Sequence, residues 1–142
     1  MILIDHSRKV IRPLDIKTMG DYVINFNQSL KARRYDIQAK FYTDMLSLDL
    51  ENLSIRLRKD VRDYKIANFA FVVESTVSIG FPMIFPLSNE LSEIGKNGDG
   101  KFIKGYIQAL LEYKRWYDVN FDLSKLYPSG ILFIEEGFQY RT

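Results

Sequence analysis

The sequence predicts an α+β protein with a small, mostly antiparallel sheet packed against three to four helices. Residues 64–87 contain one carboxylate, Glu74, and no basic side chain after Lys65, and they are rich in Phe, Val and Ile. Such a run is typical of buried strands. The flanking segments repeat apolar residues at intervals of three and four, as amphipathic helices do. With 142 residues, 46% of them hydrophobic, the chain is expected to form one domain spanning residues 1–142.

The first residues predict a hairpin followed by a helix. Residues 1–4 and 9–11 are short apolar runs, and the polar interval between them has the length that joins antiparallel strands. Pro13 is expected to end this hairpin, and Asp15 is a suitable N-cap for the helix. The apolar stripe of that helix consists of Ile16, Met19, Val23, Phe26 and Leu30.

Two more helices are expected before the apolar middle of the chain. Residues 35–47 have apolar side chains on two faces, which predicts a central helix contacted from both sides. The apolar residues of 49–64 fit a helical stripe, although Leu53, Ile55 and Leu57 also fit a strand. The length of the pattern favours the helix.

The apolar middle predicts two strands, residues 66–73 and 77–85. The polar residues between them place Glu74 in a surface turn, with a partly buried carboxylate as the alternative. A membrane-spanning helix is disfavoured, because Pro82, Pro86 and several polar side chains would then face lipid. We therefore expect no membrane contact.

The last third predicts a loop, a helix and a strand. Residues 88–100 are polar and are expected to be flexible, and residues 101–121 give the clearest helical pattern. A break at residues 128–130 precedes a last strand, 131–134. An edge strand over residues 131–140 could pair with a second copy, so a homodimer is left open.

One glycine-rich loop has the spacing of a phosphate-binding motif. In residues 95–102, two glycines five apart are followed by Lys101. Phe102 stands where the motif needs a hydroxyl to hold Mg²⁺, so we predict no nucleotide hydrolysis. Whether residues 97–101 bind an anion stays open.

The amino-acid composition excludes several kinds of catalytic and metal-binding site. The chain has no Cys, which excludes thiol catalysis and Cys-ligated zinc. It has a single His, His6. No set of acids and bases converges in the sequence, so no catalytic, cofactor-binding or metal-binding residue is predicted. The net charge of +2 does not by itself indicate a polyanionic partner. The start of the chain lacks the pattern of a secretory signal, and we expect a cytoplasmic protein.

These observations favour a non-catalytic protein-binding module, such as an inhibitor, an immunity-type neutraliser, an adaptor or an assembly subunit. Tyr, Trp and Arg concentrate binding energy at protein interfaces, and they are frequent in the last third of the chain. The expected partner is another protein. The predicted partner-binding residues are Tyr113, Arg115, Trp116, Tyr117, Phe138 and Tyr140.

Two alternatives remain open. A nucleic-acid-binding protein would use basic helix faces to contact phosphates. The basic residues that would do so are Arg33, Arg34, Arg58, Arg62 and Lys65. A small enzyme would instead need a carboxylate-based site that joins Glu74 or Glu135 to a basic or hydroxyl partner.

Overall fold

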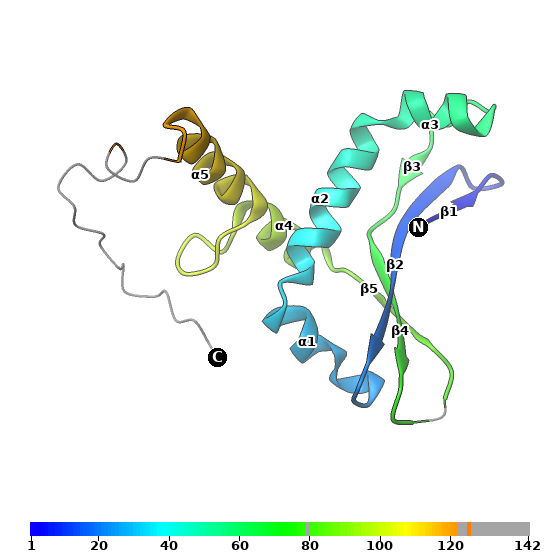
Figure 1. Cartoon of the computed structure of the whole chain (residues 1–142). Coiled ribbons are helices and arrows are strands. Elements are labelled where there is room, and N and C mark those ends of the chain that lie inside the picture. Colours follow the sequence, from blue (N-terminus) through cyan, green and yellow to red (C-terminus); the bar gives the residue numbers. More distant parts are fainter. Residues whose placement is uncertain (79, 122–124, 126–142) are drawn as a thin grey trace.

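The long strand β2 (Val10–Met19) is the central element of the fold. The computed structural model describes residues 1–78, 80–121 and 125. Strand β1 (Ile2–Asp5) pairs antiparallel with the first part of β2, and β4 (Ala70–Ser75) pairs parallel with the second part. Strand β5 (Met83–Pro86) adds antiparallel to β4. The resulting mixed sheet has the order β1-β2-β4-β5 (Figure 1).

A short strand, β3 (Lys65–Ile66), also runs parallel to β2 and precedes β4 along the same side. Between the pairs Ile11–Ile66 and Leu14–Ala70, two residues of β2 face the three residues 67–69. An extra residue of this kind produces a bulge. The bulge lies opposite Pro13, which has no N–H group to donate to the sheet. The side chain of Asn68 in this bulge reaches the start of the next helix.

The first helices cover one face of the sheet. They are the 3₁₀-helix η1 (Val23–Asn25), α1 (Phe26–Ala32) and α2 (Tyr35–Leu48). The rings of Phe26 and Phe71 lie 5.4 Å apart at the centre of the core. The buried residues of this main cluster are Phe26, Leu30, Ala39, Phe69, Phe71, Val73 and Leu87.

A second, smaller cluster lies under α3 (Leu50–Leu57). Ile11, Val61 and Tyr64 are its buried members, and Leu46 at the end of α2 packs against them. This cluster stabilises the pairing of β1, β2 and β3 at their end of the sheet.

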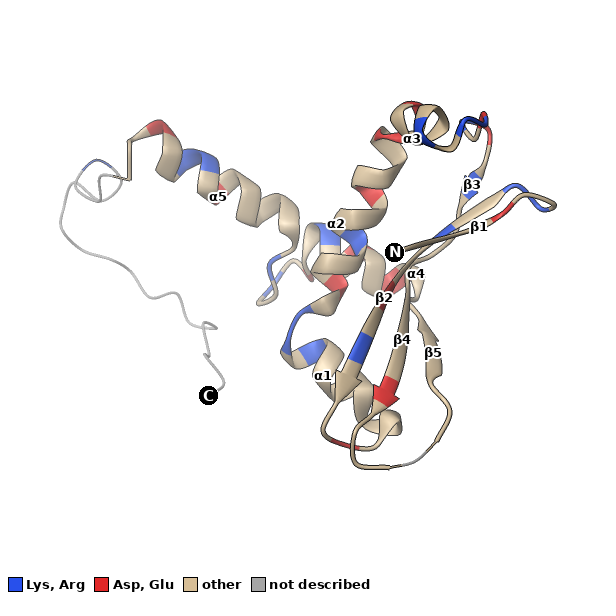
Figure 2. Cartoon of the chain, turned by 45° about the vertical axis from the view of Figure 1, so that its right-hand side comes forward, with Lys and Arg blue, Asp and Glu red and all other residues tan. Residues whose placement is uncertain are grey.

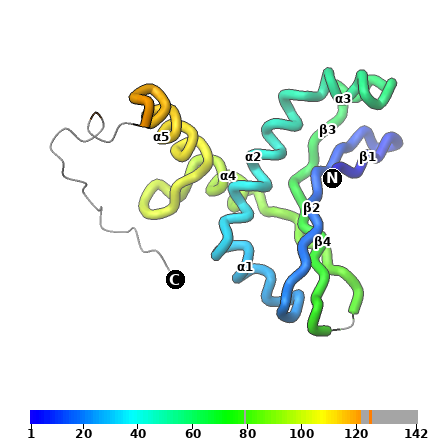
Figure 3. The backbone as a smooth tube through the Cα atoms, in the orientation of Figure 1, coloured from blue at the N-terminus to red at the C-terminus, as the bar shows by residue number. Residues whose placement is uncertain are grey.

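Two further helices build outward from α2. Helix α4 (Asn89–Asn97) packs against α2, and α5 (Tyr106–Asp118) packs against α4 (Figures 1 and 3). At the α2–α4 crossing, a Cβ added to Gly95 would collide with the backbone carbonyl of Asp36. The order of packing is thus the sheet, α2, α4 and α5, and each element contacts the one before it.

The predicted class is confirmed: this is a single α+β domain with a helix-covered sheet, and the residues that the structure describes form five α-helices where three to four were expected. The hairpin of residues 1–11 and the central helix of residues 35–47 are also confirmed. Helix α2 is contacted on two sides, by the sheet and by α4, as its two apolar faces predict.

Several predicted boundaries are wrong. The pairing of β1 with β2 does end at Pro13, as predicted, but β2 itself continues to Met19, so residues 15–19 are strand and not helix. The helix expected over 49–64 ends at Leu57, and the strands expected over 66–73 and 77–85 are shorter than predicted. Glu74 lies within β4 rather than in a turn, although it is exposed as expected.

The C-terminal third also differs from expectation. Residues 89–97, predicted as flexible, form α4, because Ser88 Oγ accepts a hydrogen bond from the backbone N–H of Leu91 and caps the helix. The helix expected over 101–121 begins at Tyr106. The strand predicted over 131–134, together with Glu135, lies outside the described residues.

Among the residues that the structure describes, no helix combines the length and the apolar content needed to cross a bilayer. The apolar segment that raised this alternative in the sequence is divided among β3, β4 and β5.

Candidate protein-contact surface and polar pocket

Helix α5 is attached to the rest of the domain through its first turn. The hydroxyl of Tyr106 donates a hydrogen bond of 2.5 Å to Oδ2 of Asp44 on α2, and its ring packs edge-on against Phe41. Gln108 caps the turn, because its Oε1 accepts from the N–H of Gly105 and its Nε2 donates to the carbonyl of Asn97. Burial and the hydrogen bond to Asp44 raise the pKa of Tyr106 to about 12.

Beyond this turn α5 extends away from the sheet (Figure 1). None of its side chains is fully buried. Leu110, Tyr113 and Tyr117 follow one another at intervals of three and four, which places them on one face of the helix. Beyond the helix end, Asn120 and Phe121 have positive φ, so the chain turns back and the ring of Phe121 joins the same face beside Tyr113. We call this face the α5 stripe. It consists of Leu110, Tyr113, Tyr117 and Phe121, with exposed fractions of 50%, 59%, 63% and 56%.

The aromatic members of the α5 stripe touch one another. The rings of Tyr113 and Tyr117 stack with centroids 6.4 Å apart, and Phe121 meets Tyr113 edge-on at 6.1 Å. These contacts restrict the side chains before any partner arrives, so less conformational entropy is lost on binding. The stripe is therefore a preorganised apolar surface.

Ion pairs accompany the stripe. Figure 2 shows that basic and acidic residues both occur along α5. Lys114 Nζ lies 2.6 Å from Asp118 Oδ2, and Lys104 Nζ lies 2.5 Å from Glu112 Oε1. Because opposite charges alternate along α5, they favour solvation of its flanks without giving the helix a strong charge of one sign.

The predicted partner-binding residues fall into three groups. Tyr113 and Tyr117 lie together on the α5 stripe, whereas Arg115, two residues from each, points to another side of the helix. Trp116 is half-buried. Phe138 and Tyr140 lie outside the described residues. The prediction missed Leu110 and Phe121 as contact residues, although their spacing from the two tyrosines is visible in the sequence.

The basic residues of the nucleic-acid alternative lie at the two ends of α2. Arg33 and Arg34 precede this helix, which is about 20 Å long, while Arg58, Arg62 and Lys65 follow α3 beyond its other end. Arg34 binds the buried carboxylate of Asp36 in a two-pronged contact, with N–O distances of 3.0 and 2.8 Å. Arg62 makes a similar contact with Asp60, with N–O distances of 2.9 and 2.6 Å.

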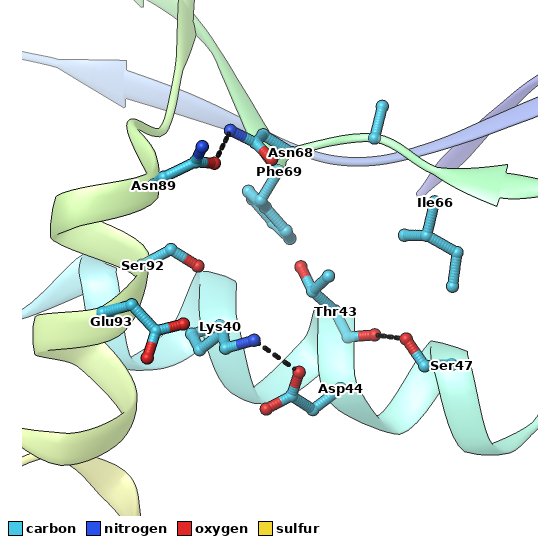
Figure 4. A pocket seen from close by; sticks show the side chains of 11 residues that line it. Lys40, Thr43, Asp44, Ser47, Ile66, Asn68, Phe69, Asn89, Ser92 and Glu93 are labelled. Atoms are coloured by element: carbon cyan, nitrogen blue, oxygen red, sulfur yellow. Dashed lines mark hydrogen bonds and ion pairs between the residues drawn. The ribbon is translucent and has the colours of Figure 1, made fainter.

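A polar pocket of about 260 Å³ lies between α2, α4 and the bulge that joins β3 to β4 (Figure 4). Asn68 closes one side, since its Nδ2 donates to the carbonyl of Leu87 at 3.0 Å and to Asn89 Oδ1 at 2.8 Å. The other polar side chains that line the pocket are Lys40, Thr43, Asp44, Ser47, Ser92 and Glu93. Hydroxyls and amides of this kind can hold a small polar molecule.

Lys40 and Asp44 of this pocket are paired with each other, and the third charged group, Glu93, accepts a hydrogen bond from Asn97 through Oε2. Lys40 Nζ lies 2.7 Å from Asp44 Oδ1, and Lys96 approaches the other oxygen of Asp44 at 4.0 Å. Partial burial acts to raise the pKa of Asp44, but the hydrogen bonds from Lys40 and Tyr106 and the two lysine charges outweigh it, so the pKa is lowered. A carboxylate whose pKa is lowered accepts a proton less readily and is therefore a weak general base.

The glycine-rich loop is closed by its own aspartate. Oδ1 of Asp99 accepts hydrogen bonds from the backbone N–H groups of Lys101, Phe102 and Ile103 at 2.8 to 2.9 Å. These are the groups that would otherwise face an anion. The hydrogen bonds, led by the one from Ile103, lower the pKa of Asp99.

Two residues considered for chemistry lie away from the pocket. Glu74 is exposed near the end of β4 and is paired in register with Thr18. His6 lies in the β1–β2 turn, where its Nδ1 is 3.0 Å from the hydroxyl of Tyr64. Neither side chain approaches the cluster around Asp44.

No family model, no curated protein and no solved structure matches this chain. Its function therefore has to be inferred from the geometry of the α5 stripe and of the pocket.

Proposed function

We propose that this chain is a non-catalytic protein-binding module and that the α5 stripe is its contact surface. One observation carries the proposal: α5 fully buries none of its side chains, and Leu110, Tyr113 and Tyr117 on one of its faces each expose half or more of their surface, as does Phe121 beyond its end. The expected partner is another protein, and we place the module in the cytoplasm.

The energetics of a helix with one unpacked face, such as α5, support this proposal. A helix of 13 residues is marginally stable in water unless one face is packed. Fully burying a large apolar side chain contributes about 1.5 to 3 kcal/mol. Covering four half-exposed side chains would thus add roughly 4 kcal/mol to the interaction. Tyrosine is also among the residues enriched at interface hot spots.

The alternatives have less support from the geometry. An enzyme that uses the polar pocket would need a carboxylate poised to exchange a proton near neutral pH, whereas the pKa of Asp44 is shifted downward. A nucleic-acid-binding protein would need Arg33 and Arg34 to act with basic residues that lie beyond the other end of α2.

Affinity capture with three forms of the full chain tests the proposal. The wild type, the stripe variant Leu110→Lys/Tyr117→Lys and the control Leu48→Lys are tagged and used to retain material from the native cell. Leu48 is a suitable control because it is 81% exposed and lies at the end of α2, away from α5. We expect a protein that is retained by the wild type and the control and lost at least tenfold by the stripe variant.

Two results would contradict the proposal. Equal retention by all three forms would mean that the α5 stripe is not the contact surface. Retention that disappears after nuclease treatment would favour the nucleic-acid alternative.

A further inference from the structure

The sheet has a second exposed apolar surface on the side opposite the helices. Residues paired in register share a face, so Ile16, Val72 and Ile84 form one row across β2, β4 and β5. The neighbouring row is Leu14, Ala70 and Pro86, in which Pro86 is exposed, Leu14 is partly buried and Ala70 is fully buried. We call these two rows, together with Leu3 of β1, the open face. Leu3, Ile16 and Ile84 are 59%, 54% and 67% exposed.

Over residues 14–17, the polarity of β2 is reversed relative to a sheet with one covered face, whereas elsewhere in the strand Ile11 and Met19 face the helices and Arg12 and Thr18 face the open side. Asp15 and Lys17 point toward the helices, where Asp15 accepts a hydrogen bond from Gln38 and Lys17 lies 4.3 Å from the ring centroid of Tyr35. Ile16, between them, points to the open face. A half-covered sheet normally places its apolar residues under the helices and its polar residues toward water. In this stretch, the order matches a sheet whose two faces are both covered.

The α5 stripe and the open face cannot meet within one copy. Helix α2 packs on the opposite face of the sheet, α4 packs on α2, and α5 follows α4 (Figures 1 and 3). Each copy therefore exposes one apolar helix face and one apolar sheet face on opposite sides of its helical layer.

The geometry points to a reciprocal dimer in which the α5 stripe of each copy packs on the open face of the other. This inference rests on the proposed function, since it names a second copy of this chain as the protein that the stripe binds. A helix on a sheet is one of the standard ways in which two apolar layers are buried.

The stripe is shorter than the strand on which it would lie. From Leu110 to Tyr117 it rises about 10 Å along the helix axis, and Phe121 turns back beside Tyr113. From Arg12 to Thr18, the residues of β2 on the open face extend over about 20 Å. The stripe therefore fits along the sheet without overhanging it.

The two surfaces agree in area. A large side chain that is half exposed offers on the order of 100 Å², so one helix-on-sheet contact buries on the order of 800 Å² over both partners. Two reciprocal contacts bury about 1,600 Å², the usual size of a stable interface. A single contact of this kind would fall below that size.

Sedimentation velocity over a range of concentrations and disulfide trapping test the dimer. We expect the full chain to sediment at twice its monomer mass, and Tyr117→Glu and Ile84→Glu each to shift it to the monomer while circular dichroism shows folded protein. Because the chain has no Cys, Tyr117→Cys and Ile84→Cys introduce single thiols. An equimolar mixture of these two variants should yield mainly the mixed disulfide, and Leu48→Cys mixed with Ile84→Cys should yield at least tenfold less.

Two results would overturn the inference. One is a wild-type chain that stays monomeric at the highest concentration. The other is predominant self-linking of Tyr117→Cys, which would mean that α5 pairs with α5. If either occurs while affinity capture still finds a stripe-dependent protein, the dimer is wrong and the proposed function stands. If capture finds no such protein and the chain is monomeric, both are wrong.

Discussion

The hydroxyl of Tyr106 donates to Oδ2 of Asp44 at 2.5 Å, and this hydrogen bond joins the first turn of α5 to the middle of α2. The same carboxylate binds Lys40 through its other oxygen. The side chain of Asp44 on α2 thus has two roles. It accepts the hydrogen bond that orients α5, and it pairs with a lysine at the rim of the polar pocket.

Replacing Tyr106 with Phe should weaken the attachment of α5. The variant loses a hydrogen bond to a charged acceptor, and we expect the free energy of unfolding in urea to fall by about 1 to 2 kcal/mol. Tyr113→Phe is the matched control, since it removes a hydroxyl from an exposed ring on the same helix, and should change stability by less than about 0.5 kcal/mol. Equal losses in the two variants would show that the Tyr106–Asp44 contact is not stabilising.

The same pair predicts how stability depends on pH. The pKa of Tyr106 is raised to about 12, so its contribution is fully present below its unfolded value near 10 and is lost as the pH rises toward 12. The pKa of Asp44 is lowered, so its contribution is present above about 3.8 and is lost as the pH falls below that value. The stability difference between wild type and Tyr106→Phe should therefore shrink at both extremes. A difference that stays constant from pH 3 to pH 12 would contradict this account.

The close crossing of α2 and α4 predicts an unequal response of two glycines. Gly95→Ala places a methyl group against the backbone of Asp36, and we expect a loss of about 1 to 3 kcal/mol despite the better helix propensity of Ala. Gly20→Ala meets nothing within 4 Å and should change stability by less than about 0.5 kcal/mol. Thermal unfolding of both variants checks this, and a tolerant Gly95 would mean that the helices lie farther apart.

The two faces of the sheet should respond differently to truncation when the chain is kept dilute. Phe71 is fully buried under the helices, so Phe71→Ala should cost about 3 to 5 kcal/mol. Ile84→Ala on the open face should cost less than about 1 kcal/mol in the monomer, because Ile84 is 67% exposed. Urea unfolding at low protein concentration measures the loss of stability in each variant. Similar losses in the two variants would contradict the conclusion that helices cover only one face of the sheet.

The sequence predicted the elements whose apolar periodicity matches their burial. Helix α2 and the β1–β2 hairpin were predicted correctly, because α2 is buried on two sides and the hairpin turn is polar. The class could also be predicted, since the uncharged middle of the chain does supply β4 and β5.

The errors have physical causes. Ile16 and Met19 fit a helical stripe together with Val23, yet β2 extends through them, and Asp15 and Lys17 find polar partners on α2 that the local pattern does not show. Helix α4 was missed because most of its residues are polar and its apolar face is short. The N-cap residue Ser88 and the spacing of Leu91 and Ile94 could have indicated the helix.

The candidate surface was predicted in part. Tyr113 and Tyr117 were named from composition, and the structure adds that they stack on an unburied helix. The open face could not be predicted, because it depends on which strands pair and in which register. The pocket, for the same reason, joins residues from α2, α4 and the bulge that are far apart in sequence.

Photo-crosslinking from position 117 in the native cell tests the central claim most directly. A photoreactive phenylalanine analogue replaces Tyr117 in one form of the chain and Leu48 in a control. We expect a discrete protein adduct from position 117, at least tenfold stronger than from position 48. The absence of any protein adduct at position 117, or adducts of equal strength at both positions, would contradict the claim that the α5 stripe is a protein-contact surface.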